Sequence, residues 1–239
     1  MIENYFETTS GALRSEPLDY ARATAGLRRG LGDWLDVAGR SVLDLGCGTG
    51  EMCWLAQDLG AARVVGVNLS QGEIDYAKRG VDAEFVHADA LAFLRDSPTG
   101  GFDRIFALNI LEHLPHDTLL AVLEECQRTL APGGTLVAMV PNATSSHGSM
   151  TRYWDVTHVS AFTPSSVQQL ARLSGFGEPT FREWGPVPYG AVSTLRYLLW
   201  QGFRGITWLR LMAETASGKG GIYTSDMIFR LHKRNVSGA

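Results

Sequence analysis

Three glycines alternate directly after an apolar run that carries one acidic side chain. Residues 42–50 read VLDLGCGTG, and a helical pattern follows them. Glycine permits positive φ values and lets a backbone approach a bound molecule closely. Open α/β sheets bind their ligands at the carboxyl ends of the strands. The spacing therefore predicts a strand, a tight ligand-binding turn and a helix.

The residue at position 51 narrows the class of ligand. A dinucleotide-binding turn needs a third glycine there, whereas this chain has Glu51. A carboxylate at that helix start would oppose a pyrophosphate group, and no Gly-Lys-Ser/Thr follows to form a P-loop. Asp44 inside the strand suits a ligand that has an ammonium group and no phosphate, such as S-adenosylmethionine.

The segment Asp44–Gly50 resembles the first motif of class I S-adenosylmethionine-dependent methyltransferases, and further similarities follow in order. Val64–Ser70 resembles the family's second strand, whose last residue holds the ribose hydroxyls, and Ala88–Ala90 resembles the adenine-binding segment. Phe102–Leu114 resembles the fourth strand with its loop, and Leu130–Gly134 the turn before the fifth strand. The resemblance covers about residues 40 to 185 and implies S-adenosylmethionine as the cofactor.

Carried over position by position, the resemblance implies a cofactor site built from the glycine turn and the strand ends. Its residues would be Asp44, Gly46, Cys47, Gly48, Gly50, Asn68, Leu69, Asp89, Ala90, Asn109 and Ile110. The family usually has Asp or Glu at the position of Asn68. A neutral amide makes weaker hydrogen bonds than a carboxylate, so Asn68→Asp is expected to retain or tighten cofactor binding.

Three side chains are candidates for the chemistry of methyl transfer to a hydroxyl group. Such a transfer benefits from alignment and from a general base, most often a histidine or a carboxylate. His113 follows the predicted fourth strand, while Asp155 and His158 precede a helix that begins at Thr163. We expect His158 to be the base, with His113 second; the alternative is that either histidine only braces its loop.

A divalent metal at His113 is doubtful. Ubiquinone-biosynthesis O-methyltransferases have a similar Glu-x-x-Glu-His loop that binds a metal, and Glu112 and His113 match it. Asn109 stands at the first of those positions. With that carboxylate absent, no metal ligand is predicted.

Short β-rich runs alternate with helical segments from residue 41 onward. The runs are Ser41–Leu45, Arg63–Val67, Ala83–His87, Phe102–Leu108, Thr135–Val140 and Tyr223–His232. This alternation predicts an α/β fold with helices on both faces of a mostly parallel sheet. The resemblance implies a Rossmann-like, seven-stranded sheet with an antiparallel last strand. We expect a single domain over residues 1–239, with an N-terminal helical segment at 1–40 and a helical insertion on the substrate side at about 186–220.

The predicted insertion has two different faces. Leu195, Leu198, Leu199, Ile206 and Leu209 form a stripe that is expected to face the core. Arg196, Trp200 and Arg204 lie on another face, where they could meet an anionic sugar carrier or the headgroup level of a membrane. The insertion could thus cover the acceptor pocket.

Composition excludes several classes of protein. Among 239 residues, 21 Lys and Arg stand against 25 Asp and Glu, and 45% are hydrophobic, which argues against disorder and against a general nucleic-acid binder. Cys47, Cys53 and Cys126 lack paired metal spacing and indicate reduced thiols in the cytoplasm. Residues 1–7 do not resemble a signal peptide, and no apolar run is long enough to predict a transmembrane helix.

The C-terminal third narrows the resemblance. Gly185–Gly190, Leu195–Leu211, Ala213–Ser217, Ile222–Thr224 and His158–Thr163 resemble methyltransferases encoded with bacterial surface-polysaccharide biosynthesis. This implies O-methylation of a sugar hydroxyl on a glycan or glycosyl precursor, with peripheral contact to the inner membrane. Two alternatives are an O-methyltransferase of a phenolic or quinone metabolite and a non-catalytic binding protein on the same fold. The oligomeric state is not indicated.

Overall fold

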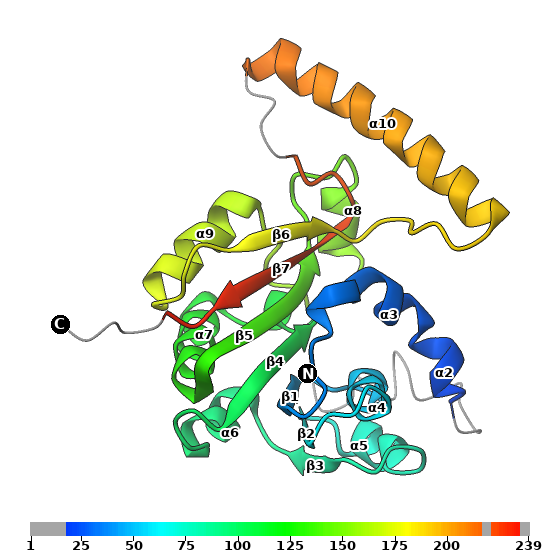
Figure 1. Ribbon diagram of the computed structural model, residues 1–239. Coiled ribbons are helices and arrows are strands. Elements are labelled where there is room, and N and C mark those ends of the chain that lie inside the picture. Colours follow the sequence, from blue (N-terminus) through cyan, green and yellow to red (C-terminus); the bar gives the residue numbers. More distant parts are fainter. Residues whose placement is uncertain (1–17, 217–220, 235–239) are drawn as a thin grey trace.

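A seven-stranded sheet forms the centre of the computed structural model, which describes residues 18–216 and 221–234 (Figure 1). The strand order is β3-β2-β1-β4-β5-β7-β6. Strands β1 to β5 pair in parallel, and β7 is antiparallel to both of its neighbours. The strands are β1 (Ser41–Leu45), β2 (Arg63–Asn68), β3 (Glu84–His87), β4 (Phe102–Leu108), β5 (Leu130–Pro141), β6 (Thr180–Glu183) and β7 (Asp226–His232). The expected α/β fold with an antiparallel last strand is confirmed.

Helices cover both faces of the sheet. On one face lie α6 (Ala90–Asp96), α7 (His116–Thr129) and α9 (Pro164–Leu173). On the other lie α4 (Glu51–Asp58) and α5 (Gln71–Ala77), with α2 (Tyr20–Ala23) and α3 (Ala25–Leu31) beside them (Figure 1). The apolar stripe of α7 is buried, and Thr163 caps α9 through a capping box with Ser166.

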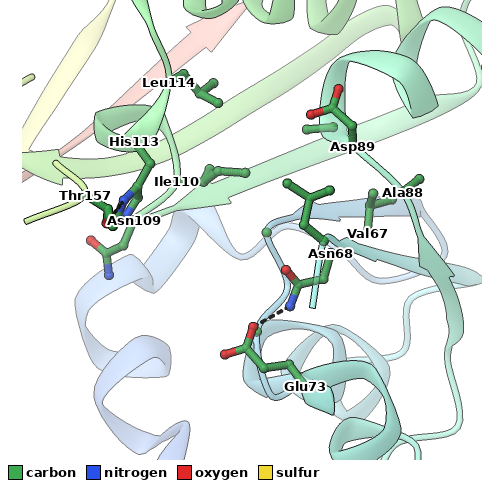
Figure 2. A pocket seen from close by; sticks show the side chains of 14 residues that line it. Val67, Asn68, Glu73, Ala88, Asp89, Asn109, Ile110, His113, Leu114 and Thr157 are labelled. Carbon is green, nitrogen blue, oxygen red and sulfur yellow. Dashed lines mark hydrogen bonds between the residues drawn. The ribbon is translucent and has the colours of Figure 1, made fainter. Parts of the chain in front are cut away.

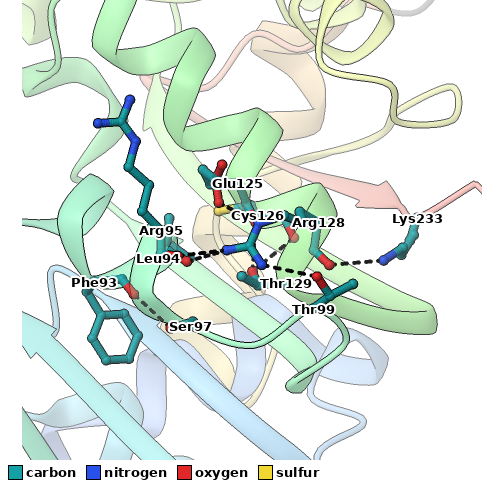
Figure 3. Close-up of polar contacts among 10 residues, drawn as sticks. All are labelled: Phe93, Leu94, Arg95, Ser97, Thr99, Glu125, Cys126, Arg128, Thr129 and Lys233. Atoms are coloured by element: carbon teal, nitrogen blue, oxygen red, sulfur yellow. Dashed lines mark hydrogen bonds and ion pairs between the residues drawn. The ribbon is translucent and has the colours of Figure 1, made fainter.

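Arg128 joins the carboxyl ends of two neighbouring helices. At the end of α7, its guanidinium donates to the carbonyl oxygen of Leu94 in α6 at 2.6 Å and to Glu125 Oε2 at 2.7 Å (Figure 3). Lys233, just beyond β7, donates to the carbonyl oxygen of Arg128 at 3.2 Å. Basic side chains commonly cap free carbonyls at helix ends in this way. The contacts fix α6, α7 and the end of β7 to one another.

The N-terminal helices brace the glycine turn. The described part of the predicted N-terminal helical segment contains α2, α3 and the 3-10 turn η1 (Gly32–Trp34), with a break at Thr24. Tyr20 in α2 donates its hydroxyl proton to the carbonyl oxygen of Thr49 at 2.7 Å. Residues 1–17 of the predicted N-terminal segment lie outside the described residues.

Strand β7 begins three residues later than the sequence predicted. The side chain of Asn142 donates to the carbonyl oxygens of Ile222 and Thr224, both at 2.8 Å. The backbone of Tyr223 donates to Glu183 Oε1 at 3.0 Å. Side chains thus take the backbone groups that strand pairing would need.

Helix α10 (Ala191–Thr215) occupies the predicted place between the last two strands of the chain, but the predicted orientation of its apolar stripe is wrong. Leu195, Leu198, Leu199, Ile206 and Leu209 are each 56–66% exposed, and the helix extends away from the sheet (Figure 1).

The polar side of α10 faces the body of the protein instead. Trp200 Nε1 donates to Glu183 Oε2 at 3.1 Å, and Arg204 pairs with the same carboxylate. Helical periodicity identifies a stripe but does not say which side a neighbour covers. Among the described helices none is long and apolar enough to cross a membrane. Residues 217–220 of the predicted insertion, including Ser217, lie outside the described range.

Candidate active site

A cavity of about 230 Å³ opens at the carboxyl ends of the parallel strands (Figure 2). Parallel pairing brings the ends of β1, β2, β3 and β4 to one edge of the sheet. Eight of the predicted cofactor residues line this cavity: Gly46, Gly48, Asn68, Leu69, Asp89, Ala90, Asn109 and Ile110. The sequence therefore located the cavity and most of its wall.

Two glycines of the turn are required by its geometry. Gly46 has φ +69°, and a Cβ there would lie 2.9 Å from Ile110 Cδ1. Gly48 has φ +50°, and a Cβ there would meet nothing within 4 Å. Because Gly48 lines the cavity, a larger side chain would take up space at the cavity wall.

Three predicted cofactor residues, Asp44, Cys47 and Gly50, are not in the cavity wall. Asp44 is buried behind the turn, where the Cys53 thiol donates to its Oδ2 at 3.5 Å. Burial raises the pKa of Asp44 to about 7. Gly50 begins α4 and packs near Ala77. These residues shape the turn, and their contact with a cofactor stays a prediction.

Glu73 is a cavity residue that the sequence analysis missed. Asn68 Nδ2 donates to Glu73 Oε2 at 2.7 Å, and both side chains line the cavity (Figure 2). Ser70 caps α5 by accepting from the backbone of Glu73 at 3.3 Å. The Ser-x-x-Glu spacing of a capping box was the signal available in the sequence. The carboxylate of Glu73 therefore lies beside Asn68. The methyltransferases that this chain resembles have their carboxylate at the position of Asn68 itself.

Asp89 caps α6 and also lies in the cavity wall, and its contact with adenine stays a prediction. Its Oδ1 accepts from the backbone nitrogens of Leu91 and Ala92 at 3.0 and 3.1 Å, which makes it the N-cap of α6. The same residue lines the cavity. Further wall residues not predicted from the sequence are Val67, Ala88, Leu114 and Thr157.

The three predicted catalytic candidates meet at one side of the cavity. His113, in the 3-10 turn η2 (Leu111–His113), has Nδ1 2.8 Å from Thr157 Oγ1. Thr157 donates its hydroxyl proton to Asp155 Oδ1 at 2.7 Å. The rings of His113 and His158 lie edge to face, with centroids 4.8 Å apart. Of the two histidines, only His113 lines the cavity.

Hydrogen bonding defines the protons on these rings. His158 Nδ1 lies 3.1 Å from the carbonyl oxygen of Thr151, which can only accept, so the Nδ1 of His158 carries the proton. The hydroxyl proton of Thr157 is directed to Asp155, so His113 Nδ1 donates to the threonine oxygen. Burial, and then the neighbouring His158, lower the pKa of His113. The lowered pKa favours the uncharged imidazole of His113, the form that a general base needs.

Glu112 lies buried beside the two histidines. Its backbone oxygen accepts from Val159 and Ser160, which anchors the segment bearing His158. Burial raises the pKa of its side chain to about 8, and its Oε2 has no hydrogen-bond partner among the described residues. Ligand atoms of Glu112, His113 and His158 lie within 4.8 Å of one another, so this cluster has the donor set for a metal ion. The expectation that a metal is doubtful stays a prediction.

Comparison with known proteins agrees with this architecture. A family described as "Methyltransferase domain" matches residues 42–134. Methyltransferase GfsG of Streptomyces halstedii is 41% identical over 113 residues, which cover 43% of this chain and 38% of that protein. Ubiquinone biosynthesis O-methyltransferase of Xanthomonas oryzae pv. oryzae is 32% identical over 137 residues, which cover 56% and 52%. The chain thus spans about half or less of the length of the curated relatives it matches.

A solved structure shares the fold over most of both chains. A SAM-dependent methyltransferase from Archaeoglobus fulgidus has a TM-score of 0.63 at 19% identity, covering 90% of this chain and 92% of that one. Residues 42–134 thus match a methyltransferase domain, and the solved structure shares the fold of this chain.

Proposed function

We propose that this chain is an S-adenosylmethionine-dependent O-methyltransferase. The observation that carries the proposal is a cavity at the strand ends whose wall holds both eight of the predicted cofactor residues and the side chain of His113. Within it, Gly46 and Gly48 would accommodate the methionine part, Asn68 and Glu73 the ribose, and Asp89 with Ala90 the adenine.

His113 is the general base in this proposal. The sequence ranked His158 first, but only His113 lines the cavity. When bound, the cofactor supplies an electrophilic methyl group on sulfur. His113 would take the proton of the acceptor hydroxyl, so that the hydroxyl oxygen could act as the nucleophile toward that methyl group. Asp155, through Thr157, and His158 would position the ring.

The acceptor that we favour is a sugar hydroxyl of a glycan or glycosyl precursor. Tyr153 and Trp154 support it, since both are exposed at the end of α8 (Gly148–Tyr153), on the segment that leads to His158. Aromatic faces of this kind can stack on sugar rings. The name of the Xanthomonas relative favours a second candidate, a phenolic or quinone acceptor. A non-catalytic binding protein is the third.

We further infer a cytoplasmic protein with peripheral membrane contact, organised as one methyltransferase domain with α10 as a substrate-side insertion. The three cysteines are free and buried, which fits a reducing compartment. The exposed apolar face of α10 supports the membrane contact.

Two assays test the function. Calorimetry with S-adenosylmethionine separates binding from no binding, and a methyl-transfer assay compares sugar, sugar phosphate, phenol and quinol acceptors. Turnover of a sugar acceptor that persists in EDTA is the expected result. Binding without turnover of any acceptor would favour the non-catalytic alternative. Loss of turnover in EDTA would show that activity requires a metal ion.

A further inference from the structure

A second cavity, of about 450 Å³, lies beyond the end of β5. It is bounded by α3, by the connection from β6 to α10 and by residues that follow β5 or precede β7. Figure 1 shows this connection running close to α3. The cavity shares no lining residue with the cofactor cavity. We call it the arginine–aromatic cavity, after Arg29, Arg196, Trp184, Tyr189, Trp200 and Tyr223.

The aromatic walls are held in place by specific contacts. Trp184 lies so close to Gly30 that a Cβ there would be 2.0 Å from its ring. Glu183 accepts from the indole nitrogen of Trp200 at 3.1 Å and from the backbone of Tyr223 at 3.0 Å. One carboxylate thus fixes two walls while remaining outside the lining itself. The cavity therefore presents aromatic faces whose positions are set before a ligand arrives.

The charges in this cavity have one sign. Arg29 places its guanidinium carbon 4.1 Å from the ring centroid of Tyr189, and Arg196 lies in the first turns of α10. Neither guanidinium has an acidic partner among the described residues, and no described acidic side chain lines the cavity. In a chain of net charge −4, two arginines in one cavity without an acidic partner among the described residues would attract an anion. Arginine is well suited to binding phosphate.

We propose that the arginine–aromatic cavity binds the phosphate-bearing end of a glycosyl phosphate or diphosphate acceptor. Arg29 and Arg196 would pair with the phosphate oxygens, and the aromatic walls would stack on the neighbouring sugar or base. This inference rests on the proposed sugar-hydroxyl function.

The segment from Ser145 to Thr157 connects the two cavities. Ser145 and His147 line the arginine–aromatic cavity, and Thr157 lines the cofactor cavity. To be methylated, an acceptor anchored at the arginines would have to extend its sugar end along this segment to His113. The sequence had placed Arg204 beside Arg196, but Arg204 pairs with Glu183 and Arg29 takes its place in the cavity.

Binding of UDP-glucose, monitored by calorimetry, tests the inference. The variant Arg29→Ala with Arg196→Ala should weaken UDP-glucose binding at least tenfold and leave S-adenosylmethionine affinity unchanged. Arg210→Ala is the matched control, because Arg210 is exposed on the same helix outside the cavity; it should change UDP-glucose affinity less than twofold. Lysine at positions 29 and 196 should recover part of the binding, which excludes a folding defect as the cause.

Further probes identify which part of the ligand is bound. Glucose 1-phosphate should bind and free glucose should not. The affinities of a short-chain polyprenyl diphosphate glucose and of UDP-glucose are then compared. Tighter binding of the first indicates a lipid carrier, and tighter binding of the second indicates a nucleotide carrier. Failure of every phosphorylated probe to bind, or equal affinity in the double variant and the Arg210→Ala control, would overturn the inference. If S-adenosylmethionine still binds in that case, the proposed methyltransferase function stands without it.

Discussion

The ribose end of the cofactor cavity depends on a pair of neighbouring side chains rather than on one. Asn68 and Glu73 are joined by a 2.7 Å hydrogen bond, so an aspartate at position 68 would face a second carboxylate. Because like charges at this distance repel, we predict that Asn68→Asp weakens S-adenosylmethionine binding. The sequence alone predicted the opposite sign, because Glu73 was not recognised as a cavity residue.

The double variant Asn68→Asp with Glu73→Gln makes this prediction sharper. It exchanges the positions of amide and carboxylate, so its affinity should return toward that of the parent protein. Glu73→Gln alone should cost about tenfold in affinity, since a charge-assisted bond becomes neutral. Calorimetry measures the S-adenosylmethionine affinity of the parent protein, the two single variants and the double variant, which together form a double-mutant cycle. Tighter binding by Asn68→Asp alone would show that the carboxylate of Glu73 does not act at this site.

The two histidines have different predicted effects on activity. His113→Ala should lower turnover by about 10²–10⁴, as expected for loss of a general base. The pKa of His113 lies below its ordinary value partly because of His158, so activity should fall only when the pH drops below the usual histidine range. In His158→Ala the pKa of His113 rises, and the acidic limb of the pH profile should move to higher pH. If His158→Ala loses activity by the full factor and the acidic limb of its pH profile does not shift, His158 is the base.

At the level of elements, η2 carries a buried acid whose protonation is linked to folding. Glu112 has a pKa of about 8 in the folded protein, well above the ordinary value for glutamate. The folded state therefore binds a proton that the unfolded state releases, and stability falls as pH rises from the ordinary value through the folded one.

Replacement of this acid should remove its share of the pH dependence. Glu112→Gln should be stabilised relative to the parent protein by an amount that grows from pH 5 to pH 9. Asp44, whose pKa is also raised, is present in both proteins and cancels in the difference. Thermal unfolding at several pH values measures it. A difference that stays constant with pH would mean that Glu112 is ionised in the folded state.

The elements differ in how far the sequence determined them. Strands β1 and β4 match their predicted bounds because short, mostly apolar runs such as Ile105–Leu108 indicate strands buried on both faces. The glycine turn was recognisable because its spacing is local. The face of α10 and the contact of His113 with Thr157, 44 residues away, depend on tertiary packing. Periodicity carries no information about such partners.

For the whole molecule, an exposed apolar surface lies along the outer side of α10. Leu195, Leu199, Ile206 and Leu209 are exposed along it, and Arg196 and Arg210 lie on the same helix. An apolar helix face with flanking basic residues is typical of helices that lie in a membrane interface. We predict that the protein co-sediments with vesicles containing anionic lipid.

A variant of the apolar face tests this prediction. Leu199→Ser with Ile206→Ser should remain in the supernatant and keep its S-adenosylmethionine affinity, because neither residue lines a cavity. Zwitterionic vesicles should bind the parent protein less well, since the basic residues then lack a counter-charge. If the parent protein does not sediment with anionic vesicles, the face has no role at membranes.

Calorimetric titration of Gly48→Val with S-adenosylmethionine is the sharpest test of whether the cavity at the glycine turn holds this cofactor. Valine at this position would enter the cavity wall and disfavour the φ of +50°. Gly39→Val is the matched control, because Gly39 also has positive φ and open space around it but lies outside the cavity. The parent protein and Gly39→Val should bind S-adenosylmethionine, whereas folded Gly48→Val should not. Equal binding by folded Gly48→Val would mean that S-adenosylmethionine does not bind at the glycine turn.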